Sequence, residues 1–333
     1  MADNQNASRD LVAIGCSAGG VETLPRLLST LPPGIPAAFC ITMHIAPTHD
    51  SQLVNILARR TPLPVQWAEQ GDPIEHGRVY VAPPDVHFLI NEGRVHLTRG
   101  ARENHVRPSI DKLFRSAAAS HGSRAVGVLM TGTLDDGVAG LRAIRDAGGF
   151  AIVQAPDDAP FPELPLRALQ VLEPDRVLRA EAIAQELIES ALLAVQPAVI
   201  PDDIGLEATL DRDAVASAVS MDRLGKQTTL ACPACSGPMW EIGDAKLRRY
   251  RCYLGHVESA RAMLTDGTTQ MEAALWSAVR ALADRATTLE TLAADAYRLG
   301  QKLSGDAYST RATEAREQAE LARQFIFDVV RWR

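Results

Sequence analysis

The stretch LVAIGCSAGG, residues 11–20, decides how this chain folds. Its first four residues are apolar and predict a buried strand, which breaks into a glycine-rich turn that carries Ser17. Because glycine has no Cβ, the turn can be sharp and can hold the serine hydroxyl clear of the sheet. The helix-compatible residues 21–30 follow directly. A serine between a strand and a helix predicts a nucleophile elbow, in which N–H groups at the helix start face the group under attack.

The alternation of apolar strands and helix-length segments continues to about residue 196. We expect strands at 11–15, 38–44, 65–68, 79–82, 125–130 and 151–154, and helices at 21–31, 51–59, 109–121, 140–147 and 180–194. Short apolar strands separated by helices predict an α/β fold with a doubly wound, mostly parallel sheet that is covered on both faces. Residues 88–97 predict a β-hairpin with its turn at Asn91-Glu92-Gly93.

The pattern divides the chain into four parts. Residues 1–196 form the predicted catalytic domain, and two prolines open a predicted linker, 197–228. Residues 229–264 form a small zinc-ribbon-like segment, and residues 265–333 form a helical hairpin. The hairpin is predicted from apolar residues whose spacings alternate between four and three. These residues are Leu275, Val279, Leu282, Ala286, Leu289, Ala293 and Ala296, then Tyr308, Ala312, Ala315, Ala319, Ala322, Ile326 and Val329.

Composition limits the classes of function. The 333 residues carry a formal net charge of −7, which disfavours a nucleic-acid partner. The most basic stretch contains Arg99, Arg102, His105 and Arg107, and we interpret it as a short solvated loop. No apolar run reaches about 18 residues, and the polar N-terminus lacks the features of a signal peptide. We therefore expect a cytoplasmic protein that does not insert into a membrane.

A serine nucleophile needs a base and a group that orients the base. His44 ends an apolar run, and if the first two strands are neighbours, Ser17 and His44 share the carboxyl edge of the sheet. A later apolar run, 126–130, ends shortly before Asp135 and Asp136. A carboxylate at that third strand end could hold the imidazole tautomer and stabilise the imidazolium. The spacing alone does not choose between the two aspartates.

Other interpretations are open at this point. A glycine turn after a strand also binds phosphate in nucleotide-binding domains, although this turn is not Gly-x-Gly-x-x-Gly and the second strand does not end at an acidic residue. The elbow could also be vestigial, in a binding or regulatory module that works through its C-terminal half. His49 and His87 are further candidates for the base.

Residues 11–195 resemble the catalytic domain of the chemotaxis protein-glutamate methylesterases, the CheB family. The resemblance rests on four motifs in the same order. They are IGCSAGG (14–20), MHIAP (43–47), RPSIDKLF (107–114) and LMTG (129–132), the last leading to Asp136-Gly137. The resemblance implies a triad of Ser17, His44 and Asp136, and so selects Asp136 over Asp135. It also implies a serine hydrolase that needs no cofactor for catalysis.

The reaction that the resemblance implies is acyl transfer from glutamyl methyl esters of chemoreceptor-like proteins, and the family also deamidates glutamine. Ser17 would attack the ester carbonyl while His44 takes its proton, and water would then release glutamate from the acyl-enzyme. The expected oxyanion and substrate-binding residues are Ala18, Gly19, Gly132 and Thr133. Ala18 stands where the family usually has threonine, and Thr133 where it usually has methionine. A backbone N–H donor survives both changes, whereas substrate preference is open.

Family members usually carry a receiver domain that covers the active site until it is phosphorylated. Only ten residues precede the first predicted strand here, so we expect an orphan member without a receiver. Control of activity would then come from the C-terminal half, from a partner or from expression. The narrow apolar seam of the predicted hairpin suits contacts with other helices, in a partner protein or in a second copy of the chain.

A cluster of sulfur and nitrogen ligands lies within residues 229–264. Cys232 and Cys235 are followed by Cys252 and His256, which is the paired spacing of a tetrahedral Zn²⁺ site. A segment this short buries little apolar surface, so a bound metal would supply its folding energy. Four protein ligands leave no open position for a substrate, and we therefore expect structural zinc.

Overall fold

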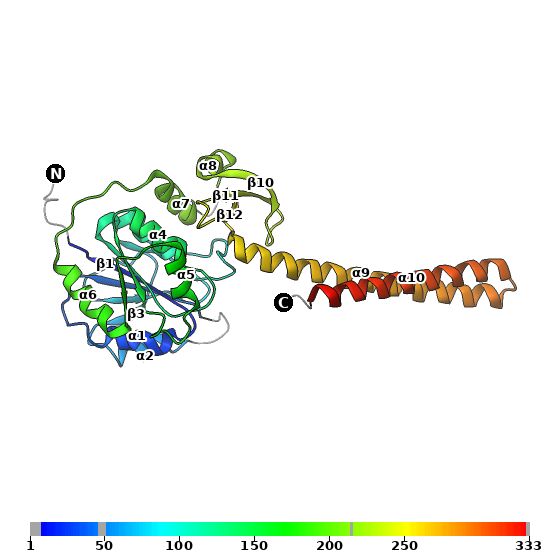
Figure 1. Cartoon of the computed structure of the whole chain (residues 1–333), viewed down its shortest axis with the longest axis horizontal. Helices are drawn as coiled ribbons and strands as arrows, with labels where there is room; N and C mark the ends of the chain where they lie inside the picture. Colours follow the sequence, from blue (N-terminus) through cyan, green and yellow to red (C-terminus); the bar gives the residue numbers. More distant parts are fainter. Residues whose placement is uncertain (1–7, 46–50, 214–215, 331–333) are drawn as a thin grey trace. The chain divides into compact units, whose positions relative to one another are not determined.

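A computed structural model describes residues 8–45, 51–213 and 216–330 of the chain (Figure 1). The chain divides into two compact units, Met1–Ala260 and Arg261–Arg333. Within the described residues, the first unit contains three sheets and the second unit is helical. His49 and the last two residues of the MHIAP motif lie outside the described residues.

The largest sheet has seven strands among the described residues, in the order β3-β4-β2-β1-β7-β8-β9, and all of them are parallel. The strands are β1 (Leu11–Cys16), β2 (Ala38–Met43), β3 (Val65–Trp67), β4 (Val79–Val81), β7 (Ala125–Leu129), β8 (Phe150–Gln154) and β9 (Arg176–Leu178). β1, β2 and β7 are buried along their whole length, as strands covered on both faces must be. The predicted parallel sheet is confirmed. β9 was not expected, because its residues are largely exposed and form no apolar run.

Helices cover both faces of this sheet (Figure 1). One face carries α1 (Gly20–Leu28), α2 (Leu53–Ala58) and α6 (Ala180–Leu192), and the other carries α3 (Ile110–His121), α4 (Val138–Asp146) and α5 (Glu163–Val171). Alternate residues of β1 pack on opposite faces of the sheet, because successive side chains of a strand point in opposite directions. Val12 belongs to the apolar cluster with Leu24 of α1, and Ala13 to the cluster with Leu113 of α3. The doubly wound arrangement is therefore also confirmed.

The predicted hairpin consists of β5 (His87–Asn91) and β6 (Arg94–Thr98), which pair antiparallel. Glu92 and Gly93 at its tip have φ values of 50° and 70°. Two central residues with positive φ are the signature of a type I′ turn, whose twist matches that of the two strands. A short 3₁₀ helix, η1 (Gly122–Arg124), connects α3 to β7.

The segment 197–228, which we expected to be a linker, contains α7 (Asp202–Asp213) and α8 (Ala218–Leu224). α7 packs against α3. Its inward residues include Glu207 and Asp211, both of which are buried. Because ion pairs as well as apolar contacts hold this face, the apolar periodicity is too weak to predict the helix.

A small sheet follows, made of β10 (Lys226–Ala231), β11 (Pro238–Ile242), β12 (Arg249–Cys252) and β13 (Val257–Ser259). Its strands pair antiparallel in chain order. Trp240 of β11 packs with Met221 of α8 in a small apolar cluster. Hereafter we call residues 226–259 the small-sheet module.

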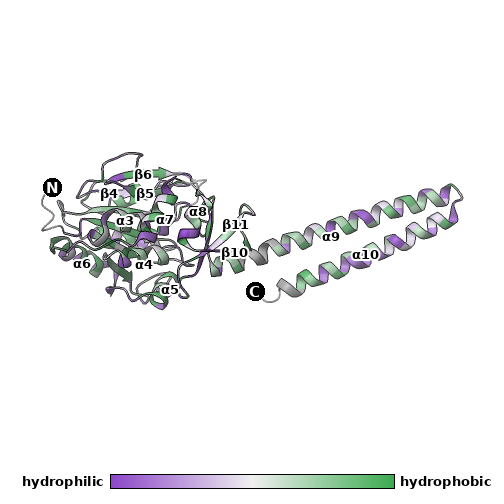
Figure 2. Ribbon diagram, turned by 90° about the horizontal axis from the view of Figure 1, so that it is seen from above, coloured by the Kyte–Doolittle hydropathy of each residue, from purple (hydrophilic) through white to green (hydrophobic). Residues whose placement is uncertain are grey.

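The second unit is built from α9 (Ala260–Arg298) and α10 (Lys302–Val330), which lie side by side in opposite directions (Figures 1 and 2). Trp276 and Phe327 meet edge to face at 6.4 Å between ring centroids, and Arg316 pairs with Glu290 at 2.6 Å. The buried seam residues are Ala286, Leu289, Ala293 and Ala296 on α9, and Ala312, Ala315 and Ile326 on α10. They all belong to the predicted apolar pattern, whose last member, Val329, has a side chain outside the description. Along the described chain, no helix combines the length and apolar character needed to cross a bilayer.

Candidate active site

Three strand ends meet at one edge of the large sheet. Ser17 directly follows β1 and His44 directly follows β2, while Asp136 lies in the loop between β7 and α4. β1 pairs with β2 on one side and with β7 on the other, so the three carboxyl ends are adjacent. The chain order reverses direction at β1, and crevices at such reversals bind ligands in open α/β sheets.

Two short hydrogen bonds join the three side chains. His44 Nδ1 lies 3.0 Å from Ser17 Oγ, and His44 Nε2 lies 2.7 Å from Asp136 Oδ2. If Nε2–H donates to the carboxylate, Nδ1 is left as an acceptor for the serine proton. The geometry thus brings together the serine, the histidine and the second of the two aspartates that the spacing left open.

Asp136 is fixed by the start of helix α3 as well as by His44. Its carboxylate accepts hydrogen bonds from Ser109 Oγ at 2.8 Å and from the N–H of Ile110 at 2.7 Å. Burial raises the pKa of Asp136, but the hydrogen bonds from His44, Ile110 and Ser109 outweigh it and leave the pKa below 3.8. The positive end of a helix favours the same ionised form. The role of Ser109 was not predicted, although a serine before an apolar helix start is an N-cap signal.

The turn around Ser17 is tightly locked. The Thr131 hydroxyl donates to the carbonyl of Ala18 at 2.9 Å, and the N–H of Ser17 donates to the carbonyl of Thr131 at 2.9 Å. Gly19 has φ +80°, and a Cβ at this position would lie 2.9 Å from Thr131 Oγ1. Position 19, directly before helix α1, therefore requires glycine.

Three of the four residues predicted to bind an oxyanion offer a free backbone donor. Within the described residues, the N–H groups of Ala18, Gly19 and Thr133 have no protein acceptor. The N–H of Gly132 instead donates to the carbonyl of Phe161 at 3.0 Å, so its expected role as a donor is not seen. Gly132 serves the site by its small size, because a Cβ there would lie 3.0 Å from Ser17 Cβ.

A cationic cavity of about 260 Å³ opens beside His44. Arg102, His105 and Arg107 line it, all from the stretch that the sequence led us to interpret as a solvated loop. The guanidinium of Arg107 is held by Asp85 at 2.8 Å and by two backbone carbonyls, and its hydrogen bond lowers the pKa of Asp85. The sequence shows the positive charge of this loop but not its place against the triad.

His87, the other described candidate for the base, has a structural role. It is fully buried, with Nε2 3.0 Å from the carbonyl of Ala101, and its Nδ1 accepts the N–H of Ser109 at 3.2 Å. Burial lowers the pKa of His87 to about 3. Both ring nitrogens are thus already used, and His87 remains neutral at physiological pH.

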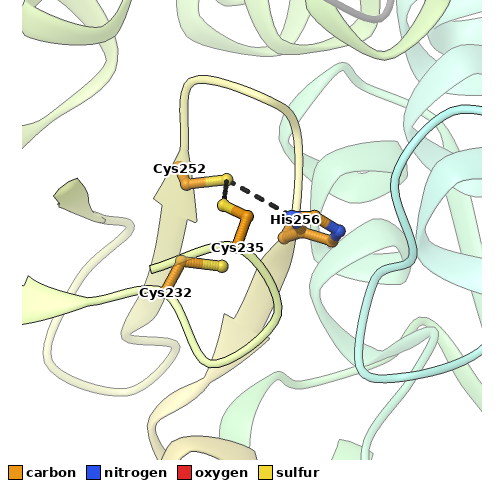
Figure 3. A group of neighbouring side chains, drawn as sticks. All are labelled: Cys232, Cys235, Cys252 and His256. Carbon is orange, nitrogen blue, oxygen red and sulfur yellow. Dashed lines mark hydrogen bonds between the residues drawn. The ribbon is translucent and has the colours of Figure 1, made fainter. Parts of the chain in front are cut away.

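The three late cysteines and His256 converge in the small-sheet module (Figure 3). Their ligand atoms all lie within 4.8 Å of one another. Cys235 Sγ is 3.8 Å from Cys252 Sγ, which in turn is 3.6 Å from His256 Nδ1. A tetrahedron with Zn–S bonds of about 2.3 Å has edges of about 3.8 Å. The residues therefore fit a tetrahedral metal ion in number, chemistry and spacing.

Comparison with known proteins assigns a family to the first unit. The family of CheB methylesterases matches residues 12–187. A protein-glutamate methylesterase/protein-glutamine glutaminase of Anaeromyxobacter dehalogenans is 38% identical over 180 residues, which cover 54% of this chain and 53% of that protein. A Methanosarcina acetivorans protein with the same activity name is 34% identical over 190 residues, covering 55% of this chain and 53% of its own.

A solved structure extends the likeness to three dimensions. The CheB methylesterase catalytic domain of Thermotoga maritima is 30% identical, with a TM-score of 0.53. The match covers 99% of that domain and 55% of this chain. The chain spans about half the length of the two sequence relatives above, and its residues beyond 187 lie outside the family match.

Proposed function

Since the chain belongs to the CheB methylesterase family, we propose that it is a serine hydrolase acting on glutamyl methyl esters of chemoreceptor-like proteins. The Oγ of Ser17 attacks the ester carbonyl, and Nδ1 of His44 takes the hydroxyl proton. His44 then returns this proton to the departing methoxide, and methanol leaves. A water molecule, deprotonated by His44, attacks the acyl-enzyme and releases the glutamate side chain and free Ser17.

The observation that carries this proposal is the pair of hydrogen bonds that joins Ser17, His44 and Asp136. Asp136 stays ionised because α3 and Ser109 solvate it, so it can stabilise the imidazolium that forms during each step. The free N–H groups of Ala18, Gly19 and Thr133 are the donors available to the tetrahedral oxyanion.

The same site supports deamidation of glutamine. An amide differs from the ester only in its leaving group, so His44 would give its proton to the departing NH₂ group, which leaves as ammonia, rather than to methoxide. The two relatives described above carry both activities in their names. We therefore propose protein-glutamine glutaminase activity as the second reaction of this site.

A fluorophosphonate probe tests the proposed nucleophile, because such probes label only activated serines. We expect labelling of Ser17 alone, with loss of labelling in Ser17→Ala and in His44→Ala. Ser29→Ala, at an exposed serine directly after α1, is the matched control and should label like wild type. Binding of a nucleotide without labelling would instead favour a phosphate-binding turn, and absence of both would favour a vestigial elbow.

For the Cys–His cluster we propose a structural Zn²⁺ held by Cys232, Cys235, Cys252 and His256. The fit to a tetrahedron supports it, and the sparse apolar core of the module gives the metal a folding role. Purified protein should contain about one zinc per chain, and Cys232→Ser should release it. Protein prepared without chelators and found free of zinc would contradict this proposal.

A further inference from the structure

The cationic wall of the active-site cavity is formed by one segment, residues 101–108, which we call the cleft loop. Arg102, His105 and Arg107 of this loop face the cavity beside His44. They are well placed to contact the polypeptide around a glutamyl ester. The conformation of the cleft loop therefore bears on how a protein substrate is bound.

The cleft loop is attached to β13 by backbone and side-chain contacts. The N–H of Asn104 donates to the carbonyl of Val257 at 2.8 Å, and the N–H of Val257 donates back to Arg102 at 3.4 Å. The side-chain oxygen of Asn104 accepts the N–H of Ser259 at 3.0 Å. His105 Nε2 lies 3.3 Å from the carboxylate of Glu258, which is buried. The loop thus behaves as an added strand on the small-sheet module.

The loop conformation needs this support. Asn104 and His105 have φ values of 48° and 66°, two consecutive non-glycine residues in the left-handed region. Residues in this region are strained and persist only where the surroundings hold them. Here the surroundings are β13 on one side and Asp111, which accepts from the Asn104 amide at 3.3 Å, on the other.

β13 begins directly after His256, the last residue of the Cys–His cluster. The turn between Cys252 and His256 is closed by two backbone hydrogen bonds, from the N–H of Cys252 to the carbonyl of His256 at 3.0 Å and from the N–H of Gly255 to the carbonyl of Cys252 at 2.9 Å. A metal that binds both side chains would clamp this turn from the other side. Fixing the turn fixes the start of β13, and β13 carries the cleft loop.

We propose that the Cys–His cluster is a positioning device for the active site, which sets the cleft loop through β13 when a metal is bound. This inference rests on the proposed function for its catalytic consequence. Loss of the metal frees the loop and weakens binding of a protein substrate. The triad is untouched, because Ser17, His44 and Asp136 are held by the large sheet and by α3.

Hydrogen exchange on the full chain tests the inference without relying on activity. Protein stripped with a chelator and protein reloaded with Zn²⁺ are compared at the amides of Asn104 and Val257. We expect exchange at these amides to rise at least about tenfold on stripping, whereas the core amides of α1 change little. In parallel, KM for a methylated receptor should rise several-fold, while turnover of a small ester stays within about twofold.

Two variants test the contact between the cleft loop and β13 while the metal stays bound. Asn104→Gly tolerates the positive φ but removes the acceptor for Ser259, and Glu258→Gln removes the charge that faces His105. Both should loosen the loop and raise KM in zinc-loaded protein. Glu241→Gln is the matched control, since Glu241 lies in the same sheet and pairs with Arg248.

Two outcomes would overturn this inference, and a third would count only against the proposed function. Exchange at Asn104 and Val257 that is unchanged after zinc has left would overturn it while leaving the zinc site and the triad intact. Protein that never takes up zinc would overturn both the inference and the metal proposal. Normal exchange changes in an enzyme that hydrolyses no ester would instead count against the proposed function alone.

Discussion

Asp136 and Asp135 are neighbours in sequence with different surroundings. Asp136 is buried and receives hydrogen bonds from His44, Ser109 and the N–H of Ile110, whereas Asp135 is half-buried at the rim. The difference arises from the loop after β7, where Leu134 has φ 66° and re-aims the chain. Gly137, directly after Asp136, also has a positive φ of 103°, so the chain turns on both sides of the aspartate pair.

Asp136→Asn should lower ester hydrolysis by several orders of magnitude, because an amide cannot select the reactive tautomer or stabilise the imidazolium. Asp135→Asn is the matched control and should leave kcat/KM within about threefold. Steady-state kinetics on a methylated peptide measures both. A greater loss with Asp135→Asn would show that the second aspartate is not the one that orients His44.

At the scale of single residues, the sequence analysis named the three side chains of the proposed triad but not the residues that surround and orient them. Ser17, His44 and Asp136 follow apolar runs, so their meeting at a sheet edge follows from strand topology. Ser109 and the cationic loop gave no such signal, because their positions depend on contacts between segments far apart in the chain. Whether the N–H of Gly132 is free depends on Phe161, another distant residue.

Among the elements, the longest and most buried are those that the sequence predicted best. β1, β2 and β7 are wholly buried and almost entirely apolar, and the seam of α9 and α10 repeats at heptad spacing over many turns. β9 has three residues, and α7 presents acidic residues to the interior, so neither produces an apolar period. The spacing of apolar residues predicts elements that pack through apolar contacts, and it does not detect elements that are held by ion pairs.

Those ion pairs form a buried cluster between α3, α7 and the small-sheet module. Arg115 of α3 contacts Glu103 at 2.6 Å and Asp211 of α7 at 2.7 Å. Arg251, next to Cys252, contacts Asp211 at 2.8 Å, and Arg249 holds Glu207 with two bonds of 2.9 Å. The cluster makes α7 part of the catalytic unit rather than a free connection.

Acid should loosen this cluster. Burial raises the pKa of Glu207, but the charges of Arg115 and Arg249 outweigh it and lower the pKa to about 2, from an ordinary value of 4.5. A carboxylate with a depressed folded-state pKa stabilises fully above its unfolded value and loses this contribution as pH falls towards the folded one. We therefore expect the stability of α7 to fall between about pH 4.5 and pH 2.

Hydrogen exchange of the α7 amides as a function of pH measures this loss. Glu207→Gln should be less stable at pH 7, because it removes the nearer carboxylate partner of Arg249 and leaves the more distant Glu103, at 3.5 Å, and it should show a smaller decline over the acid range. A decline in Glu207→Gln as steep as in wild type would assign the acid sensitivity to other groups.

At the scale of the whole molecule, the compact unit that contains the triad extends further along the chain than the family match. The match stops at residue 187, whereas the first compact unit extends to Ala260. The difference consists of α7, α8 and the small-sheet module, which share the buried charges of Arg115 and the contacts of the cleft loop. Through these two sets of contacts, α7 and the small-sheet module support the active site.

Two truncations distinguish this account from one with a dispensable C-terminal half. A chain ending at Ala260 should fold and turn over a small ester like the full chain, and weaker turnover of a methylated receptor would assign docking to the helical hairpin. A chain ending at Val195 lacks α7, which packs on α3 and pairs Arg115 with Asp211, and it should therefore be less stable than the chain ending at Ala260. Thermal unfolding of both chains checks the expectation, and equal stability would contradict it.

Release of methanol from a methylated receptor tests the central claim most directly. Wild-type protein should release methanol and leave unmodified glutamate. Ser17→Ala, folded as judged by unchanged circular dichroism, should release it several orders of magnitude more slowly. Methanol release by Ser17→Ala at the wild-type rate would contradict the claim that this serine and its triad carry the reaction.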